Sequence, residues 1–310
     1  MRWCSLRTRR SLVDLSDLSG DELEIIFTRA QRFEEHPPGP LLAGVACVNL
    51  FFEASTRTFV SFNLAELRLG AHVVNLSPKD ASLATKGETI EDTAMTLGAM
   101  GVAVFVLRHP ESGYAGKVAL AFDGHVINAG DGMHAHPTQA LLDLFTLREE
   151  FGTLLSRTVA IVGDVAHSRV AHSSMLGLRR LGADVVLVGP PEFVSEADAP
   201  PGVTIERDLD KIAPHLDAVI LLRIQRERIG AMPFSEEEYV ARYRLDAQRC
   251  AALPAHVVVL HPGPYNRGIE LDESVLSFAG WRYARQVMHG VSVRMAVLDL
   301  LVNGPADAAC

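Results

Sequence analysis

The feature that most constrains the fold is an alternation of short, continuous apolar runs with longer segments of helical periodicity. In the first half, strand-length apolar runs lie at residues 44–51, 71–76, 102–107 and 125–128, and helical patterns lie at 56–69, 89–100 and 113–122. Continuous apolar runs are typical of parallel strands that are covered on both faces. The pattern therefore predicts repeated βαβ units around a buried parallel sheet.

The same alternation starts again in the second half, after a long predicted helix at 137–151. Strands are expected at 158–163, 184–188, 218–222 and 257–260, and helices at 169–181, 209–216 and 236–243. A capping box of Ser19 and Glu22 begins an earlier helix that runs to Glu35, and a last helix at 285–302 follows the second sheet. A chain of 310 residues has the length of about two average domains, so we predict two α/β domains.

Composition narrows the class of protein and of partner. With 48% hydrophobic and 22% charged residues, the chain has enough apolar side chains for a large core, which excludes a disordered protein. The net charge of −9 opposes a nucleic-acid or anionic-membrane partner, and no apolar run reaches membrane-spanning length.

The cysteines and the amino-terminal segment bear on the cellular compartment. The four cysteines lack the spacing of a zinc site or of a disulfide framework: Cys4, Cys47, Cys250 and Cys310. The apolar segment after the basic residues 1–10 is too short and too charged for a signal peptide. We therefore expect a cytoplasmic protein with reduced thiols.

Hydroxyl side chains and a guanidinium lie at the start of the helix predicted after the first strand: Ser55, Thr56, Arg57 and Thr58. A helix N-terminus offers unpaired backbone N–H groups and the positive end of the helix dipole, and arginine adds a bidentate cation. The motif therefore favours a phosphate site. An ordinary Ser/Thr cap followed by an unrelated arginine has the same sequence, so the motif alone leaves both interpretations open.

Further polar side chains follow the ends of predicted strands, where open α/β sheets bind their ligands. In the first half these are Arg108, which ends the third strand, and His136 and Gln139, which begin the long helix. Arg108 and Arg57 would converge if their strands are neighbours. Taken alone, Arg108 also fits a solvated strand end, and a His-Pro pair at a helix start is usually structural.

In the second half, the strand ends carry Arg169, Arg223, Gln225 and the turn at 261–264. Two arginines at strand ends suit a ligand with two carboxylates. The chain lacks a P-loop, a G-x-G-x-x-G turn, a G-x-S-x-G elbow and an H-E-x-x-H pair. Asp164 and His167 have an i, i+3 spacing, which is a weak metal pattern in a loop, so we expect no metal and no cofactor.

Taken together, these motifs resemble the catalytic chains of aspartate carbamoyltransferases, within the aspartate/ornithine carbamoyltransferase superfamily. The resemblance rests on F-F-E-A-S-T-R-T at 51–58, S-L-A-T-K-G-E at 82–88, R-H-P at 108–110, H-P-T-Q at 136–139, R-I-Q at 223–225 and H-P-G-P at 261–264. The first and fourth elements are common to carbamoyltransferases, whereas the 82–86 loop, R-x-Q and H-P-x-P resemble the aspartate branch. The S-M-G and H-C-L-P elements of ornithine carbamoyltransferases are absent.

The resemblance implies two doubly wound α/β domains, each with a parallel sheet flanked by helices, and an active site in the interdomain cleft. Residues 1–150, joined by the C-terminal helix 286–310, would bind carbamoyl phosphate, and residues 151–285 would bind L-aspartate. The implied product is N-carbamoyl-L-aspartate, in the second step of pyrimidine biosynthesis. The implied assembly is a homotrimer with sites shared between subunits, which can join regulatory chains or a dihydroorotase.

The resemblance also implies roles for individual residues near the first substrate. The phosphate would be held by Ser55, Thr56, Arg57, Thr58 and Arg108. Arg57, Thr58 and His136 would stabilise negative charge on the carbonyl oxygen. The carbamoyl NH₂ group would be recognised by Gln139 and by the backbone of the turn that contains Gly263 and Pro264.

For the second substrate, the resemblance implies that Arg169, Arg223 and Gln225 bind the two carboxylates of aspartate. Ser82 and Lys86 match residues that the neighbouring subunit contributes. One position departs from the family pattern, because Phe59 replaces a usual arginine after S-T-R-T. The alternatives are a carbamoyltransferase for another amine, such as ornithine, and a non-catalytic scaffold of the same fold, which Phe59 alone favours.

Overall fold

The computed structural model describes residues 11–79, 87–229 and 234–305. The chain divides into two compact units, unit 1 with residues 1–138 and 290–310 and unit 2 with residues 139–289. Both divisions fall inside helices, α6 (Pro137–Phe151) and α12 (Tyr283–Asn303). Each unit has its own parallel sheet, which confirms the predicted α/β fold class.

The sheet of unit 1 has four parallel strands in the order β2-β1-β3-β4. They are β1 (Ala46–Phe51), β2 (His72–Leu76), β3 (Val102–His109) and β4 (His125–Asp131). The chain enters at β1, moves outward to β2, and then crosses back to β3 on the other side of β1. The gap between the carboxyl ends of β1 and β3 is therefore the topological switch point, where doubly wound sheets bind ligands.

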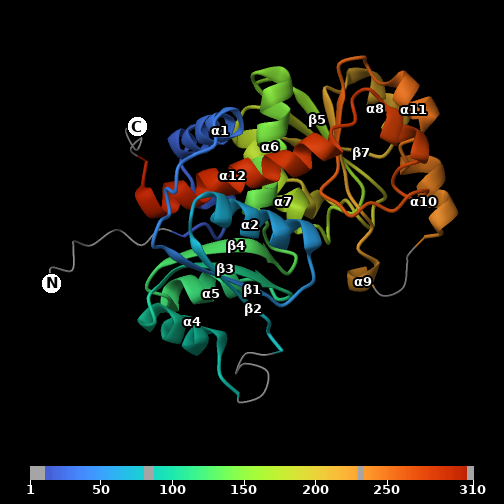
Figure 1. The fold of residues 1–310 in the computed structure, drawn as a ribbon. Helices are drawn as coiled ribbons and strands as arrows, with labels where there is room; N and C mark the ends of the chain where they lie inside the picture. The colour runs from blue at the N-terminus through green and yellow to red at the C-terminus, as the bar shows by residue number, and fades with distance from the viewer. Residues whose placement is uncertain (1–10, 80–86, 230–233, 306–310) are drawn as a thin grey trace. The chain divides into compact units, whose positions relative to one another are not determined.

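Helices cover both faces of this sheet (Figure 1). On one face, α4 (Ile90–Ala99) and α5 (Tyr114–Ala121) enclose a core that includes Phe105 and Phe122, and α2 (Thr56–Arg68) lies on the other face. The first helix, α1 (Gly20–Glu35), begins with the predicted capping box. A buried ion pair joins α1 to the last part of α12, with Arg29 Nη1 2.8 Å from Asp299 Oδ2.

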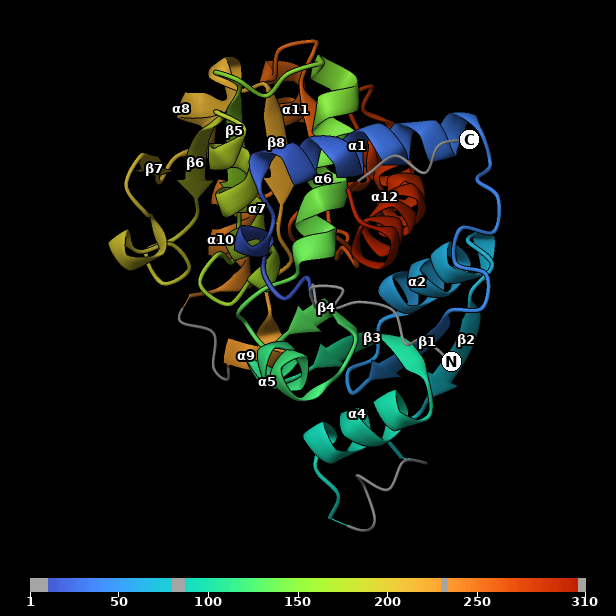
Figure 2. The same cartoon turned by 90° about the vertical axis from the view of Figure 1, so that its left-hand side faces the viewer.

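The sheet of unit 2 has five parallel strands in the order β7-β6-β5-β8-β9, four of which are labelled in Figure 2. They are β5 (Thr158–Val162), β6 (Asp184–Val188), β7 (Val203–Glu206), β8 (Ala218–Leu221) and β9 (Val258–Leu260). This sheet is also doubly wound, and its switch point lies between β5 and β8. Strand β7 was not predicted, because it is a short edge strand without a continuous buried run.

The helices of unit 2 agree with the predicted periodicity where they are long. The α-helices that lie wholly within unit 2, among the described residues, are α7 (Arg169–Arg180), α8 (Leu209–Ile212), α9 (Arg226–Ile229), α10 (Glu236–Tyr243) and α11 (Ala247–Ala252). The short helices α9 and α11 were not predicted. The helix expected at 209–216 tightens into a 3₁₀ turn at Ala213–His215, where Pro214 has no N–H to continue the α-helix.

Glycine is required where the ends of β5 and β8 approach each other. Gly163, directly after β5, has a φ of +123°, which strongly favours glycine. A Cβ at this position would lie 2.8 Å from the Leu222 carbonyl oxygen and 3.0 Å from the Tyr239 hydroxyl. The loops after these two strands therefore start from closely packed backbones.

Within the described ranges, no helix is long and apolar enough to cross a membrane.

Candidate functional site

The predicted phosphate motif forms the N-terminus of α2, directly after β1. Ser55 is the N-cap residue, yet its side chain makes no capping hydrogen bond within the described part of the chain. By contrast, the hydroxyls of Ser19, Thr89 and Ser168 each accept a hydrogen bond from a backbone N–H at the start of their helices. The α2 terminus thus departs from the ordinary cap that the sequence left open, and its N–H groups are available to an anion.

Arg108 lies at the end of β3, next to the end of β1. It pairs in register with Phe51, and its carbonyl oxygen accepts a hydrogen bond of 2.9 Å from the Phe52 N–H. Its Nε lies 3.3 Å from Glu53, and its Nη1 donates to the Ala129 carbonyl oxygen at 3.1 Å. Arg108 therefore links the segment that follows β1 to the end of β4. Strands β1 and β3 are neighbours, as the predicted convergence of Arg108 with Arg57 requires.

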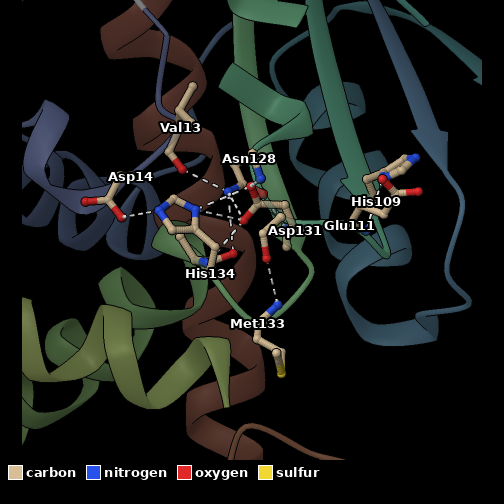
Figure 3. A network of polar contacts seen from close by, with 12 residues as sticks. Val13, Asp14, His109, Glu111, Asn128, Asp131, Met133 and His134 are labelled. Carbon is tan, nitrogen blue, oxygen red and sulfur yellow. Dashed lines mark hydrogen bonds and ion pairs between the residues drawn. The ribbon is translucent and has the colours of Figure 1, made fainter. Parts of the chain in front are cut away.

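The turn after β4 is organised by a buried carboxylate, which Figure 3 shows. Asp131 is 1% exposed and accepts hydrogen bonds from the N–H groups of Gly113 (2.9 Å) and Ala135 (3.1 Å) and from Asn128 Nδ2 (3.1 Å). His134 Nδ1 lies 3.2 Å from the same carboxylate. These contacts fix the backbone that leads into His136 and α6. Asp131 was not among the predicted site residues, although the Gly-Asp-Gly sequence at 130–132 was an available signal.

His136 directly precedes α6, and Gln139 lies in the first turn of this helix. His136 is 4% exposed, and Gln139 is 8% exposed. Gln139 Nε2 donates to Asp143 Oδ1 at 2.9 Å. The division between the two units falls between Thr138 and Gln139, in the first turn of α6.

In unit 2, a second buried carboxylate joins the loops after β5 and β8. Asp164 is fully buried, and its Oδ2 accepts the Gln225 N–H at 3.0 Å. Its Oδ1 lies 2.7 Å from His167 Nδ1, and Arg228 donates to the His167 carbonyl oxygen at 2.7 Å. These contacts hold the segments before α7 and after β8 side by side.

The predicted aspartate-binding residues follow the same two strands. Arg169 is the first residue of α7 and is 5% exposed. Arg223 Nη2 donates to Gln225 Oε1 at 3.1 Å, and both side chains are half-buried. The structure thus brings Arg223 and Gln225 together at the switch point of unit 2, next to the loop that leads to Arg169.

The turn after β9 contains Gly263 and Pro264. The Gly263 N–H donates to His261 Nδ1 at 2.8 Å, and His261 Nε2 lies 3.3 Å from Glu270 Oε1. His261 and Glu270 are each 1% exposed. The buried imidazole therefore holds the turn through the Gly263 N–H. Gly263 and Pro264 themselves remain partly exposed to solvent.

The remaining predictions concern the 82–86 loop, Phe59 and the cysteines. Ser82 and Lys86 lie outside the described residues. Phe59 packs edge-on against Phe51, with ring centroids 5.3 Å apart, so the departure from the family pattern fills space beside the end of β1. Cys47 and Cys250 are free and buried.

Two groups near the unit 1 motifs have shifted pKa values. Burial lowers the pKa of His109, which stacks on Tyr114 at 3.7 Å beside Arg108. Burial also raises the pKa of Glu66, on α2, to about 7. Over residues 11–79, 87–229 and 234–305, no cluster of His, Cys, Asp and Glu side chains is suited to hold a metal ion.

Comparison with known protein families divides the chain much as the sheets do. Residues 10–149 match the family described as aspartate/ornithine carbamoyltransferase, carbamoyl-P binding domain. Residues 156–301 match the aspartate/ornithine carbamoyltransferase Asp/Orn binding domain.

Similar curated proteins span nearly the same length. The aspartate carbamoyltransferase catalytic subunit of Salinispora arenicola is 51% identical over 86% of this chain and 87% of its own length. The corresponding subunit of Salinispora tropica is 48% identical over 95% and 98%.

Solved structures show the same similarity. Aspartate transcarbamoylase from Trypanosoma cruzi, in complex with carbamoyl aspartate and phosphate, has a TM-score of 0.85 and 32% identity over 94% of this chain and 95% of that one. The catalytic subunit of M. jannaschii aspartate transcarbamoylase has a TM-score of 0.81 and 30% identity over 95% and 98%.

Proposed function

Because the chain belongs to the aspartate/ornithine carbamoyltransferase family, we propose that it transfers the carbamoyl group of carbamoyl phosphate to the amine of L-aspartate. The products are N-carbamoyl-L-aspartate and inorganic phosphate. The observation that supports the proposal is that each sheet has groups suited to bind an anionic ligand at its own switch point. In unit 1 these groups are the N–H groups at the start of α2, where the Ser55 side chain makes no capping hydrogen bond, and in unit 2 they are the side chains of Arg223 and Gln225.

In this proposal, carbamoyl phosphate binds mainly through residues of unit 1. The N–H groups and hydroxyls of Ser55, Thr56 and Thr58 receive the phosphate, and Arg57 and Arg108 neutralise its charge. Arg57, Thr58 and His136 stabilise the negative charge that develops on the carbonyl oxygen when the amine attacks. Gln139 and the backbone at Gly263 and Pro264 accept hydrogen bonds from the carbamoyl NH₂ group.

Unit 2 binds aspartate, with Arg169, Arg223 and Gln225 at its two carboxylates. The aspartate nitrogen forms a bond to the carbonyl carbon, the bond from that carbon to the phosphate oxygen breaks, and the nitrogen loses a proton. No covalent enzyme intermediate is needed, since orienting two bound reactants can lower a barrier by about 7–11 kcal/mol at best.

The direct test is the purified chain with carbamoyl phosphate and either L-aspartate or L-ornithine. We expect release of phosphate and formation of carbamoyl-aspartate with aspartate only. A faster reaction with ornithine would mean that ornithine, and not aspartate, is the acceptor. The absence of product at saturating substrate concentrations would reject the proposed reaction. A bisubstrate phosphonate that joins the two substrates should bind tightly, whereas a non-catalytic scaffold with a damaged site should not bind it.

We further propose a homotrimer in which Ser82 and Lys86 complete the site of a neighbouring subunit. Arg57→Ala and Lys86→Ala chains should each be inactive alone and recover part of the activity when mixed. Recovery follows from mixed sites that receive an intact residue from each chain. A mixture without recovered activity would contradict a shared site.

The cellular setting is a separate proposal. The reaction product fits pyrimidine biosynthesis, and the cysteine pattern fits a cytoplasmic enzyme. Regulatory chains or a dihydroorotase are the partners proposed for the trimer. Gel filtration of native material, with an activity assay on each fraction, tests the trimer and its partners together.

A further inference from the structure

A buried polar network in unit 2 lies behind the residues proposed to recognise the carbamoyl NH₂ group. Its centre is Asp143 on α6, which is fully buried. Asp143 Oδ1 accepts two hydrogen bonds, from Gln139 Nε2 at 2.9 Å and from Gln286 Nε2 at 2.6 Å. Gln286 lies on α12 and is 1% exposed. One carboxylate oxygen therefore holds amide groups from two helices.

The chemistry of a carboxylate sets the direction of both amides. An ionised carboxylate only accepts hydrogen bonds, whereas a glutamine amide has a donor end and an acceptor end. With its NH₂ end bound to Asp143, Gln139 presents its Oε1 on the other side. That oxygen can accept a hydrogen bond from an NH₂ group, but it cannot donate one. The orientation is thus suited to a carbamoyl group.

Gln286 has the same orientation as Gln139: its NH₂ end is bound to Asp143, and its oxygen contacts the turn after β9. Gln286 Oε1 accepts the His261 N–H at 3.1 Å. The next link is the hydrogen bond from the Gly263 N–H to His261 Nδ1, at 2.8 Å. Because Nδ1 accepts, the proton of the neutral ring lies on Nε2, which faces Glu270 at 3.3 Å. A continuous chain of hydrogen bonds therefore runs from Asp143 to the turn that contains Gly263.

We propose that Asp143 is a positioning residue that aligns two sets of acceptors, Gln139 Oε1 and the backbone of the 261–264 turn, for the NH₂ group of the substrate. The inference rests on the proposed function, since it assigns these acceptors to carbamoyl phosphate. Asp143 acts through Gln139 and Gln286 and selects a carbamoyl group over an acyl group that has a methyl in place of NH₂. The selectivity arises because a methyl group leaves the aligned acceptors without donors.

The test compares ligands that differ at this one group. Calorimetric titration measures the affinity of wild type and Asp143→Ala for carbamoyl phosphate, acetyl phosphate and inorganic phosphate. We expect the affinity for carbamoyl phosphate to fall about tenfold or more in Asp143→Ala, as for the loss of a buried hydrogen bond. The affinities for acetyl phosphate and inorganic phosphate should change less than about twofold, since neither ligand has an NH₂ group. A structural role alone would weaken all three ligands together, and this result would overturn the proposal.

Two further variants keep the test decisive. Asp143→Asn retains one acceptor oxygen and should keep most of the preference for carbamoyl over acetyl phosphate; complete loss of that preference would contradict orientation by an acceptor. Gln286→Met removes the acceptor of the His261 N–H and should reduce the preference for carbamoyl over acetyl phosphate. This variant serves as the test if Asp143→Ala does not fold. A preference equal to wild type in Gln286→Met would overturn the role of the turn.

Asp217 provides the matched control. It is a half-buried aspartate at the amino-terminal end of the unit 2 sheet, directly before β8, where it accepts the Thr158 N–H at 2.9 Å. Asp217→Asn should leave the ligand preference unchanged. Turnover of wild type with aspartate is measured alongside: its absence would reject the proposed function, whereas normal turnover with an unchanged preference in Asp143→Ala would reject only the role of Asp143.

Discussion

Glu66 links the stability of unit 1 to pH through the helix that carries the phosphate motif. It lies on α2 and is fully buried, and its Oε2 accepts a hydrogen bond of 2.7 Å from Asn49 Nδ2. The same Asn49 nitrogen donates to Asn75 Oδ1 at 3.1 Å. Burial raises the pKa of Glu66 from 4.5 to about 7, against the smaller opposing effect of the Asn49 hydrogen bond.

The sign and size of the pH effect follow from this shift. Between pH 4.5 and about 7 the folded chain retains a proton on Glu66 that the unfolded chain has lost, so stability falls as pH rises. The contribution is fully present below pH 4.5 and is lost above the folded-state pKa of about 7. One pKa unit corresponds to about 1.4 kcal/mol, so ionisation of Glu66 removes about 3 kcal/mol of stability by pH 8.

The perturbation is Glu66→Gln, which keeps an acceptor for Asn49 and cannot ionise. We expect it to stabilise unit 1 by about 2–3 kcal/mol at pH 8 and to change stability little at pH 5. Hydrogen exchange of peptides from α2 and β1 measures this unit locally. Glu35→Gln, at an exposed position on α1, is the control and should show no such contrast. Equal effects of Glu66→Gln at pH 5 and pH 8 would refute the reasoning.

Three further predictions concern unit 2. Burial lowers the pKa of His289 from 6.5 to about 4, so stability should fall by about 3 kcal/mol as pH drops through this range; urea unfolding should show a flatter pH profile for His289→Gln. Gly163→Ala should cost about 2 kcal/mol or more in the same assay, because its Cβ would meet the Leu222 carbonyl oxygen at a positive φ. Asp164→Ala frees the Gln225 N–H and should raise KM for aspartate about tenfold, with a smaller change in KM for carbamoyl phosphate; equal changes would contradict a local effect.

The longer elements of the fold were predictable because burial on both faces imposes a continuous apolar run. The strand predicted at 184–188 and the helix predicted at 236–243 coincide with β6 and α10. Edge strand β7 was missed because its residues are only partly buried and show no such run. The short helices α9 and α11 were missed because a few residues cannot show a helical period, and tertiary contacts decide their conformation.

The side chains proposed to touch substrate could be selected from the sequence for a different reason, since they lie near strand ends in motifs with a recognisable chemistry. What the sequence did not reveal is which buried groups hold those motifs. Asp131 lies in a Gly-Asp-Gly sequence and Asp164 has an i, i+3 spacing to His167, but neither pattern identifies a carboxylate that positions a loop, and Asp143 shows helical spacing alone. Their partners are backbone N–H groups and amides that become neighbours only when the chain folds.

These three carboxylates explain why the binding residues alone do not define either switch point. Each is buried at about 1% exposure or less, and each accepts from two or more groups on separate segments. Removing such an acceptor leaves buried donors unpaired, which costs about 1–3 kcal/mol per group and loosens the segments that the carboxylate joins. Replacing a substrate-binding arginine instead lowers the affinity for the ligand and leaves these segments in place. Loss of affinity together with loss of stability therefore distinguishes a carboxylate that positions the site from a cation that binds the substrate.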